Sequence, residues 1–345
     1  MHNLELLGWR NFFAAQLDTD TPLVPARVMA VHRGRVDVAG NDFETRLPLS
    51  GNSAELQITV GDWVLVDSDG PRISALLDRF GVFKRGAAGT SHAIQLIAAN
   101  VDTLFIVTSA NRDFNVARLE RYLAVAQDAG AFPVVVISKA DTVDSVDDYV
   151  ARASRLSPGL LVEALDARKH DDVERLRPWC GPGQTVALLG SSGVGKSTLI
   201  NTLTGAVQDT REIREDDQRG RHTTTGRSMH RLPQGGWLID TPGMRELQLV
   251  DVGDALDDVF SDIVEFAEQC RFSDCSHEAE PGCAVQAAID DGELDAERLT
   301  RCRKLQSEDR RNTETIAERR ARDRVLGQMY KSIQSGQRQL KGGKK

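Results

Sequence analysis

Long apolar runs are absent from this chain of 345 residues. None approaches the roughly 20 apolar residues of a membrane-spanning helix, so we expect no membrane partner. A signal peptide is not indicated either, because the stretch from Met1 to Leu17 already contains Glu5, Gly8 and Arg10. We therefore expect a cytoplasmic protein with room for two or three domains. No apolar stripe demands a dimer, so we expect a monomer.

Cysteine is scarce, with five residues in the chain. In a reducing compartment, cysteines are metal ligands or core residues before they are disulfides. Three of them join a histidine within fourteen residues in the pattern C-x4-C-x-H-x5-C. Such a set closes a tetrahedral Zn²⁺ site, so we predict one structural zinc ion; the alternative is a coincidence of buried cysteines. The four residues are Cys270, Cys275, His277 and Cys283.

Positive charge is in deficit, with 43 Lys+Arg against 51 Asp+Glu and a net charge of −8. This balance argues against a nucleic-acid partner, but the charge is unevenly distributed. Residues 298–345 hold 15 basic and 5 acidic side chains. A basic tail of this kind indicates a nucleic-acid partner, and the alternative is a solvated helix face.

Short alternating runs recur in the first part of the chain, separated by turn residues. Five such strands at this spacing predict a small barrel of the OB type over residues 1–80. Barrels of this type often bind RNA, and Arg33 and Arg35 flank the first turn. The alternative is a barrel that only packs against its neighbour. The runs are 26–31, 35–38, 43–47, 63–67 and 72–77, and residues 80–100 are interpreted as a connector.

Near-continuous apolar runs alternate with helical segments over residues 81–250. Runs of this kind are typical of buried parallel strands, so we predict an α/β domain whose sheet is covered on both faces. The runs are 103–108, 133–137, 160–162 and 185–189.

A phosphate-binding loop, G-x-x-x-x-G-K-S, follows the last of these runs and opens a helical segment. Its glycines let backbone N–H groups wrap a polyphosphate at a helix N-terminus. Lys196 would contact the β- and γ-phosphates, and the Ser197 hydroxyl would coordinate Mg²⁺. We therefore expect a bound nucleoside triphosphate with Mg²⁺. The loop consists of Gly190, Ser191, Ser192, Gly193, Val194, Gly195, Lys196 and Ser197, with Thr198 next.

The run 133–137 ends in Ser138-Lys139-Ala140-Asp141. Strand ends of this kind bind ligands in α/β proteins. The Asp141 carboxylate would accept from the ring N1–H and the amine of guanine, whereas adenine has an acceptor at N1. The Lys139 stem would cover the base plane. This is the guanine signature Asn/Thr-Lys-x-Asp with Ser138 first, and beside a phosphate loop it favours GTP and GDP.

Another apolar strand ends in Asp-x-x-Gly, from Asp240 to Gly243. Asp240 would hold the Mg²⁺ shell, and the Gly243 N–H can meet the γ-phosphate. Ras-like enzymes have next a glutamine that orients water, but this chain has Met244. We therefore expect slow intrinsic turnover, with the missing group supplied by another segment or by a partner.

A polar segment, residues 208–236, separates the phosphate loop from this strand. Long charged segments beside phosphates are typical of nucleotide-sensing switches, and the alternative is a disordered insertion. We expect Thr224 or Thr225 to complete the Mg²⁺ coordination. His222 is our candidate for orienting the water, and the alternative is a histidine that caps or contacts RNA.

The order of the motifs is unusual. The guanine signature at Ser138 precedes Gly190 by 52 residues, whereas most GTPases have it last. A circular permutation explains this order, because domain termini often lie close together. Three rival functions remain. One is an assembly factor in which RNA-binding modules do the work and the GTPase is only a timer. The others are a P-loop ATPase or small-molecule kinase and a transcriptional or translational RNA-binding protein with an inactive nucleotide site.

These motifs in this order resemble the RsgA (YjeQ) family of circularly permuted GTPases that depend on the small ribosomal subunit. The resemblance implies an OB barrel at 1–80, a permuted GTPase domain at 81–250 and a zinc-binding helical domain with a basic tail at 251–345. It also implies late maturation of the small ribosomal subunit, with its rRNA as the main partner. It rests on residues 61–64, 97–102, 113–123, 190–197, 220–225 and 240–243 and on the zinc cluster.

Two positions depart from the family pattern. Ser138 stands where Asn is usual, and this shorter side chain is expected to lose a bond to guanine N7 or to the phosphate loop. Glu163 stands where Ser is usual in the next base-contacting segment. A backbone contact from Ala164 to guanine O6 is expected to survive that change.

Overall fold

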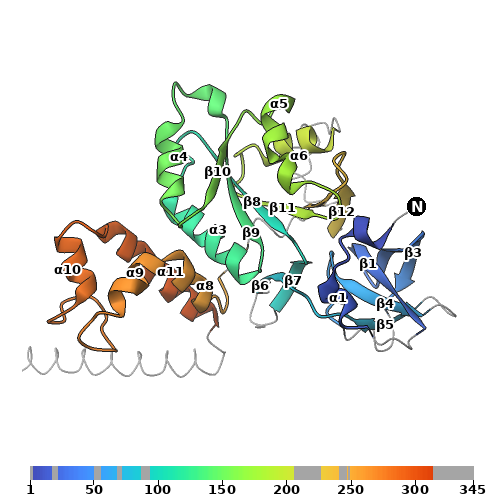
Figure 1. Ribbon diagram of the computed structural model, residues 1–345, viewed down its shortest axis with the longest axis horizontal. Coiled ribbons are helices and arrows are strands. Elements are labelled where there is room, and N and C mark those ends of the chain that lie inside the picture. The colour runs from blue at the N-terminus through green and yellow to red at the C-terminus, as the bar shows by residue number, and fades with distance from the viewer. Residues whose placement is uncertain are drawn as a thin grey trace, which may run out of the picture.

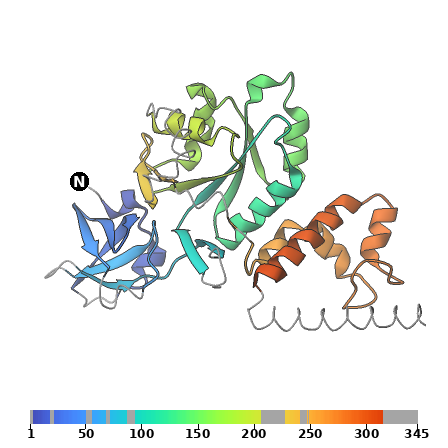
Figure 2. The ribbon, with the colours of Figure 1, turned by 180° about the vertical axis from the view of Figure 1, so that it is seen from behind.

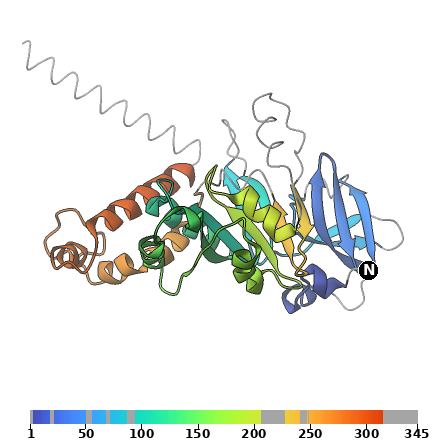
Figure 3. The same cartoon turned by 90° about the horizontal axis from the view of Figure 1, so that it is seen from above.

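Figure 1 shows the computed structural model, in which a β-rich part, a central sheet with helices and a group of helices follow one another. The view from above places the β-rich part and the helical group at opposite ends of the central sheet (Figure 3). The structure describes residues 3–17, 22–49, 56–67, 72–86, 94–205, 227–240, 247 and 249–313.

The N-terminal part is a five-stranded antiparallel sheet around one aliphatic core. Its strand order is β3-β2-β1-β4-β5. Alternate residues such as Val36 and Val38 face a core to which all five strands contribute. The strands lie where the alternating runs predict them, in the expected OB-type barrel. They are β1 (Leu23–His32), β2 (Arg35–Gly40), β3 (Phe43–Pro48), β4 (Trp63–Asp67) and β5 (Ile73–Leu76), preceded by η1 (Leu4–Leu7) and α1 (Asn11–Ala14).

The segment interpreted as a connector contains an antiparallel hairpin, β6 (Val82–Gly86) and β7 (Ile94–Ala99). Only one side chain on each strand, Phe83 and Ile97, is a large buried hydrophobic group, which is too sparse a pattern to predict strands. The hairpin ends at Asn100, whose side-chain amide donates to the Gly61 carbonyl at 3.0 Å and so ties the segment to the barrel.

The central domain is a parallel sheet with strand order β10-β9-β8-β11-β13. Successive residues of each strand point to opposite faces, and each face has its own core. Leu104 and Ile106 pack with α3 on one face, while Phe105 and Val107 pack with α6 on the other. The predicted cover on both faces is thus observed. The strands are β8 (Thr103–Ser109), β9 (Phe132–Ser138), β10 (Leu161–Ala164), β11 (Thr185–Leu189) and β13 (Trp237–Asp240).

Helices connect these strands and close the two faces. Asn115 caps the longest of them, α3, by accepting from the Arg118 N–H at 2.9 Å. The others are shorter, and α6 ends at Gly205, whose backbone is in the left-handed conformation with φ 65°. They are α3 (Val116–Asp128), η2 (Ala140–Thr142), α4 (Asp147–Ser154), α5 (His170–Val173), η3 (Glu174–Trp179) and α6 (Lys196–Thr204).

The C-terminal helices pack against α3, as seen from behind in Figure 2. Their buried side chains, among them Leu256, Phe260 and Leu299, belong to the same core as one face of the central sheet. These helices are α8 (Gly253–Val259), α9 (Ser261–Ala267), α10 (Ala284–Asp290) and α11 (Ala296–Thr313). None of the helices in the described ranges is both long and apolar enough to cross a bilayer.

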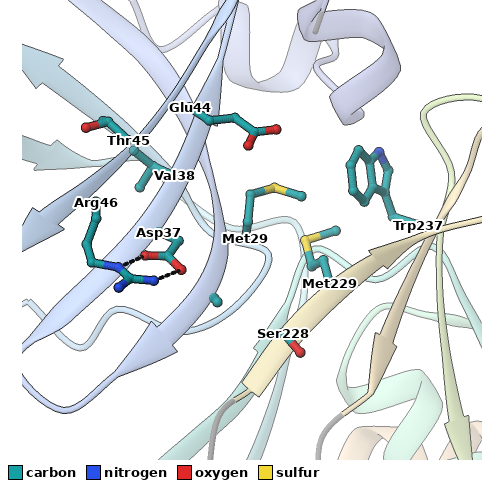
Figure 4. A pocket seen from close by; sticks show the side chains of 10 residues that line it. Met29, Asp37, Val38, Glu44, Thr45, Arg46, Ser228, Met229 and Trp237 are labelled. Carbon is teal, nitrogen blue, oxygen red and sulfur yellow. Dashed lines mark hydrogen bonds and ion pairs between the residues drawn. The ribbon is translucent and has the colours of Figure 1, made fainter. Parts of the chain in front are cut away.

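The barrel and the central domain share one continuous sheet. Strand β12 (Arg227–Arg231) is antiparallel to β13 and also to β1, with Ala30 opposite Ser228 and Val31 opposite Arg227. A pocket of about 520 Å³ lies along this junction, where Met29 and Met229 face each other beside Trp237 (Figure 4). The barrel therefore pairs with the strand that directly follows residues 206–226.

Candidate functional site

The candidate nucleotide site lies at one edge of the central sheet. Because β8, β9, β11 and β13 are parallel, their carboxyl ends meet at that edge. The guanine signature follows β9, the phosphate loop follows β11, and Asp240 ends β13. The tertiary structure thus brings together motifs that lie up to about a hundred residues apart in the chain.

The phosphate loop needs its glycines for space and for backbone conformation. A Cβ at Gly190 would come within 2.2 Å of the Val107 carbonyl oxygen of the neighbouring strand. Gly195 precedes α6 with φ 91°, in the left-handed region, and provides no side-chain cap. The first N–H groups of α6 therefore remain free of a side-chain cap and can donate to an anion.

Lys196 is the first residue of α6, and its ammonium is held by the loop itself. The Nζ atom donates to the carbonyl oxygen of Gly190 at 2.6 Å and also to that of Ser191. The next residue, Ser197, lies in the same first turn and is partly buried. Both side chains are therefore close to the loop that is predicted to cradle the phosphates.

Ser138 connects the base site with the phosphate loop. Its buried hydroxyl lies 2.5 Å from the Val194 carbonyl oxygen and 2.9 Å from that of Thr108. The hydroxyl proton is therefore donated to one of these two backbone carbonyl groups. The shorter side chain was expected to lose a bond either to guanine N7 or to the phosphate loop. The bond to the phosphate loop is present. Lys139 forms a second hydrogen bond between these two segments, because its Nζ donates to the Gly193 carbonyl oxygen at 2.7 Å.

Asp141, predicted to recognise the base, has a partner that sequence reasoning missed. Arg168 donates from Nη2 to an Asp141 oxygen at 2.6 Å. The same guanidinium binds the buried Asp166, from Nε at 2.9 Å and from Nη2 at 3.0 Å, which lowers the pKa of that carboxyl below its ordinary value. The sequence offers no clear signal for this partner, because the burial of Asp166 becomes visible only in the fold.

Ala164, the other predicted base contact, ends β10 directly beside the end of β9. It is paired with Ile137, and the next residue, Leu165, donates its N–H to the Ile137 carbonyl at 2.9 Å. The backbone of the two segments that are predicted to contact the base is therefore held side by side. Four further predicted residues, His222, Thr224, Thr225 and Gly243, lie outside the described residues.

The four predicted zinc ligands come together between α9 and α10. Their ligand atoms all lie within 4.8 Å of one another. His277 Nδ1 is 3.5 Å from the sulfur atoms of both Cys270 and Cys283. Zinc bonds of about 2.0–2.3 Å in a tetrahedron separate the ligand atoms by about 3.5 Å, so this set fits the ion. Burial, together with the Arg303 charge, lowers the pKa of His277 and favours the neutral imidazole that binds metals.

The fold and the site define a P-loop nucleotide-binding protein whose base-recognition loop precedes its phosphate loop in the chain. A family model described as RsgA GTPase matches residues 76–250. A second model, described as ABC transporter, matches residues 174–341, which contain the phosphate loop that both kinds of protein share. That match covers under half of the chain and does not set its family.

Curated relatives match nearly the whole chain. It is 48% identical over 338 residues to the small ribosomal subunit biogenesis GTPase RsgA 2 of Vibrio parahaemolyticus, covering 97% of this chain and 94% of that protein. It is 51% identical over 312 residues to the small ribosomal subunit biogenesis GTPase RsgA of Mesorhizobium japonicum, covering 89% and 90%. The chain therefore belongs to the RsgA GTPase family, and it is a GTP hydrolase.

Solved structures show the same fold. YjeQ from Thermotoga maritima matches with a TM-score of 0.64 at 26% identity, covering 83% of this chain and 98% of that chain. YloQ, described as a circularly permuted GTPase, matches with a TM-score of 0.62 at 23% identity, covering 87% and 99%. The permutation expected from the order of the motifs is confirmed.

Proposed function

We propose that this chain acts in late maturation of the small ribosomal subunit, binding the subunit through its rRNA and hydrolysing GTP to GDP and phosphate. The names of the two relatives described above support this role. The observation that supports the proposal most is that β9 and β11, the parallel neighbours of β8, end at the same edge of the sheet, so that Asp141 and Lys196 follow strands ending at one edge. Turnover is slow in the free protein and faster on the subunit.

The proposed nucleotide contacts follow from the geometry of that edge. The loop from Gly190 to Thr198 supplies N–H groups and the Lys196 ammonium to the phosphates. Asp141 accepts from guanine, Lys139 covers the base, and the Ala164 backbone donates to O6. Arg168 must leave Asp141 when the base binds. Because its side chain is 67% exposed, this ion pair is weak and its loss costs little.

Oxygen donors suited to Mg²⁺ lie at the same edge. Ser197 is in the first turn of α6, and the exposed Asp240 ends the strand next to β11. We assign Ser197 and Thr225 as direct ligands, with Thr224 as the alternative to Thr225 and Asp240 in the shell. When bound, Mg²⁺ neutralises charge on the β- and γ-phosphate oxygens.

The water-orienting group is assigned to His222, since Met244 offers no donor or acceptor of that kind. Lys196 and the Gly243 N–H stabilise the charge on the γ-phosphate. The substitution His222→Ala tests the assignment: subunit-stimulated hydrolysis should fall by roughly a hundredfold, as for other positioned acid–base groups. Full stimulated turnover in this variant would exclude His222.

The remaining assignments concern the metal, the oligomeric state, the location and the domains. One structural Zn²⁺ is held by the cluster of Cys270, Cys275, His277 and Cys283. The protein is a cytoplasmic monomer with no membrane partner, and its domains comprise residues 1–80, 81–250 and 251–345. The basic residues after 298 are a further candidate contact to rRNA.

The decisive experiment measures GTP hydrolysis by the full chain with and without purified small ribosomal subunits. We expect slow turnover alone and a clear acceleration with subunits, while large subunits serve as the matched control. Equal rates in all three conditions would contradict the proposal. A competition between ATP and GTP for the free protein tests nucleotide choice, and equal affinities would contradict the guanine assignment.

A further inference from the structure

Arg118, which lies in the stretch 113–123 of the family resemblance but has no role assigned so far, contacts the phosphate loop. It lies in the first turn of α3, and its Nη1 donates to the Ser191 hydroxyl at 2.5 Å. The two residues are 73 positions apart in the chain. Helix α3 follows β8, and β8 is the parallel neighbour of the loop strand β11, so the start of α3 and the loop share one edge of the sheet.

The charge of Arg118 has no acidic partner in the part of the chain that the structure describes. Its side chain donates to the neutral Ser191 hydroxyl, whereas the side chain of Arg121 pairs with Glu308. Arg118 is also half-buried. An arginine placed only for stability would gain more from a carboxylate, because two opposite charges attract each other in addition to forming the hydrogen bond.

Ser191 contacts two cationic side chains. The Ser191 hydroxyl accepts from Arg118, and the Ser191 carbonyl oxygen accepts from the Lys196 ammonium, which also donates to the Gly190 carbonyl. The orientation of the Lys196 side chain therefore depends on where the Ser191 backbone lies. A displaced Ser191 would remove one of the two carbonyl groups that aim the ammonium at the β- and γ-phosphates.

Helix α3 gives Arg118 a fixed base. Two residues later, the fully buried Glu120 accepts from Arg298 at 3.1 Å and from Arg301 at 2.8 Å, both on α11. Buried side chains of α3, such as Leu119 and Leu123, pack on the central sheet. The helix is thus held on two sides, so the Arg118 guanidinium has a defined position relative to the loop.

We propose that Arg118 is a positioning residue for GTP hydrolysis, acting through Ser191 on Lys196. The proposal rests on the assigned GTPase activity of this site. In the transition state, charge changes most on the β–γ bridging oxygen and the γ-phosphate. A displaced Lys196 ammonium therefore lowers the hydrolysis rate more than it weakens nucleotide binding. GDP lacks the γ-phosphate and its affinity is least affected.

The test is a double-mutant cycle on the full chain with Arg118→Ala, Ser191→Ala and the double variant. We expect each single variant to lower kcat roughly 10- to 100-fold, the effect of losing one bond to a charged group. The double variant should be no slower than either single variant, because both remove the same bond. GDP affinity should change less than threefold, and Arg118→Lys should recover part of the rate.

Controls separate this inference from the function itself. Arg155→Ala removes an exposed arginine at the end of α4 and should leave kcat unchanged. Thermal unfolding of each variant should match the parent chain, which excludes a loss of fold. If the parent chain hydrolyses GTP but Ser191→Ala is as fast, or if the two effects add, the Ser191 route is wrong. If the parent chain does not hydrolyse GTP, the assigned function fails instead.

Discussion

Asp141 is the residue that we propose to decide which base the site accepts. Its carboxylate offers two acceptors to the two donors that guanine presents at N1 and at the amine. In the structure it stands next to Arg168, which in turn is bound to the buried Asp166. Asp141, Arg168 and Asp166 therefore form a small charge network, and in the proposed complex guanine would replace Arg168 as the donor to Asp141.

Substituting Asp141→Asn should change the base preference. The amide replaces one acceptor by a donor, which faces a donor of guanine, so GTP and GDP should bind roughly 100-fold more weakly. Xanthine has a carbonyl in place of that amine and should regain a bond to the amide. Competition binding with GTP and xanthosine triphosphate measures both effects.

The control is Asp148→Asn, which changes a carboxylate with a 77% exposed side chain on α4. It should bind GTP as the parent chain does. Unaltered GTP affinity in the Asp141→Asn protein would show that this carboxylate does not recognise the base.

The Cys-His cluster is a second feature at the residue scale, and it predicts the metal content of the protein. The purified chain should contain one zinc ion, and Cys283→Ala should lose it because three ligands do not close a structural site. Metal analysis by mass spectrometry gives the stoichiometry. Cys302→Ala removes a buried cysteine of α11 outside the cluster and should keep the ion. Retention of zinc by the Cys283 variant would contradict the ligand set.

Helix α3 is the element that joins the nucleotide site to the C-terminal helices. Its first turn contacts the phosphate loop through Arg118, while Glu120 and Arg121 pair with α11. The Glu120 side chain is fully buried, and Arg298 also donates to Asp262 on α9. Three elements therefore depend on one buried charge cluster.

Removing Glu120 should destabilise this junction strongly. In Glu120→Ala two arginines lose their buried partner, which costs about 3–5 kcal/mol when one side of a buried pair is removed. Urea unfolding followed by tryptophan fluorescence and circular dichroism should show an earlier first transition. Glu297→Ala is the matched control, because its side chain is 88% exposed and its contact with Arg301 is long at 3.8 Å. Equal urea midpoints for the Glu120 and Glu297 variants would contradict the claim that the buried Glu120 stabilises this junction.

At the scale of the whole molecule, the barrel and the GTPase domain are one sheet. The joining strand β12 directly follows the residues that we assign to the switch. Within the described residues, the pairing of β1 with β12 consists of two residue pairs, Ala30 with Ser228 and Val31 with Arg227. A short junction of this kind can respond to the nucleotide without unfolding either part.

Hydrogen exchange should therefore report the nucleotide at this junction. We expect the amides of Ala30, Val31 and β12 to exchange at different rates in the GDP state and in the state with a non-hydrolysable GTP analogue. The barrel hairpin β2–β3 lies further away and serves as an internal control. Identical exchange of β1 and β12 in both states would mean that the barrel does not sense the nucleotide.

Local patterns in the sequence are enough to predict the main parts of this protein. The phosphate loop, the guanine signature and the zinc cluster are short, because backbone geometry fixes the spacing of residues that bind one ligand. The barrel strands and the parallel strands also follow their apolar patterns. The hairpin β6–β7 was missed because it buries too few side chains to leave a period of two.

Contacts between residues far apart in the chain could not be predicted from the sequence. Arg118 with Ser191, Arg168 with Asp141 and Glu120 with Arg298 are separated by 73, 27 and 178 residues. An arginine in a sequence does not indicate its partner, since many carboxylates and hydroxyls compete for it. Only the parallel order of β9, β8 and β11, and the packing of α11 on α3, bring these pairs within bonding distance.

The sequence by itself was enough to predict a guanine-nucleotide hydrolase, the order of its motifs and the four residues that gather into a set compatible with zinc. These properties depend on neighbours along the chain, whose spacing is set by covalent geometry. The tertiary structure decided which side chains support the motifs and how the parts are joined. The reason is that the Ser191 contact, the Glu120 cluster and the β1–β12 junction all depend on packing between segments far apart in the chain.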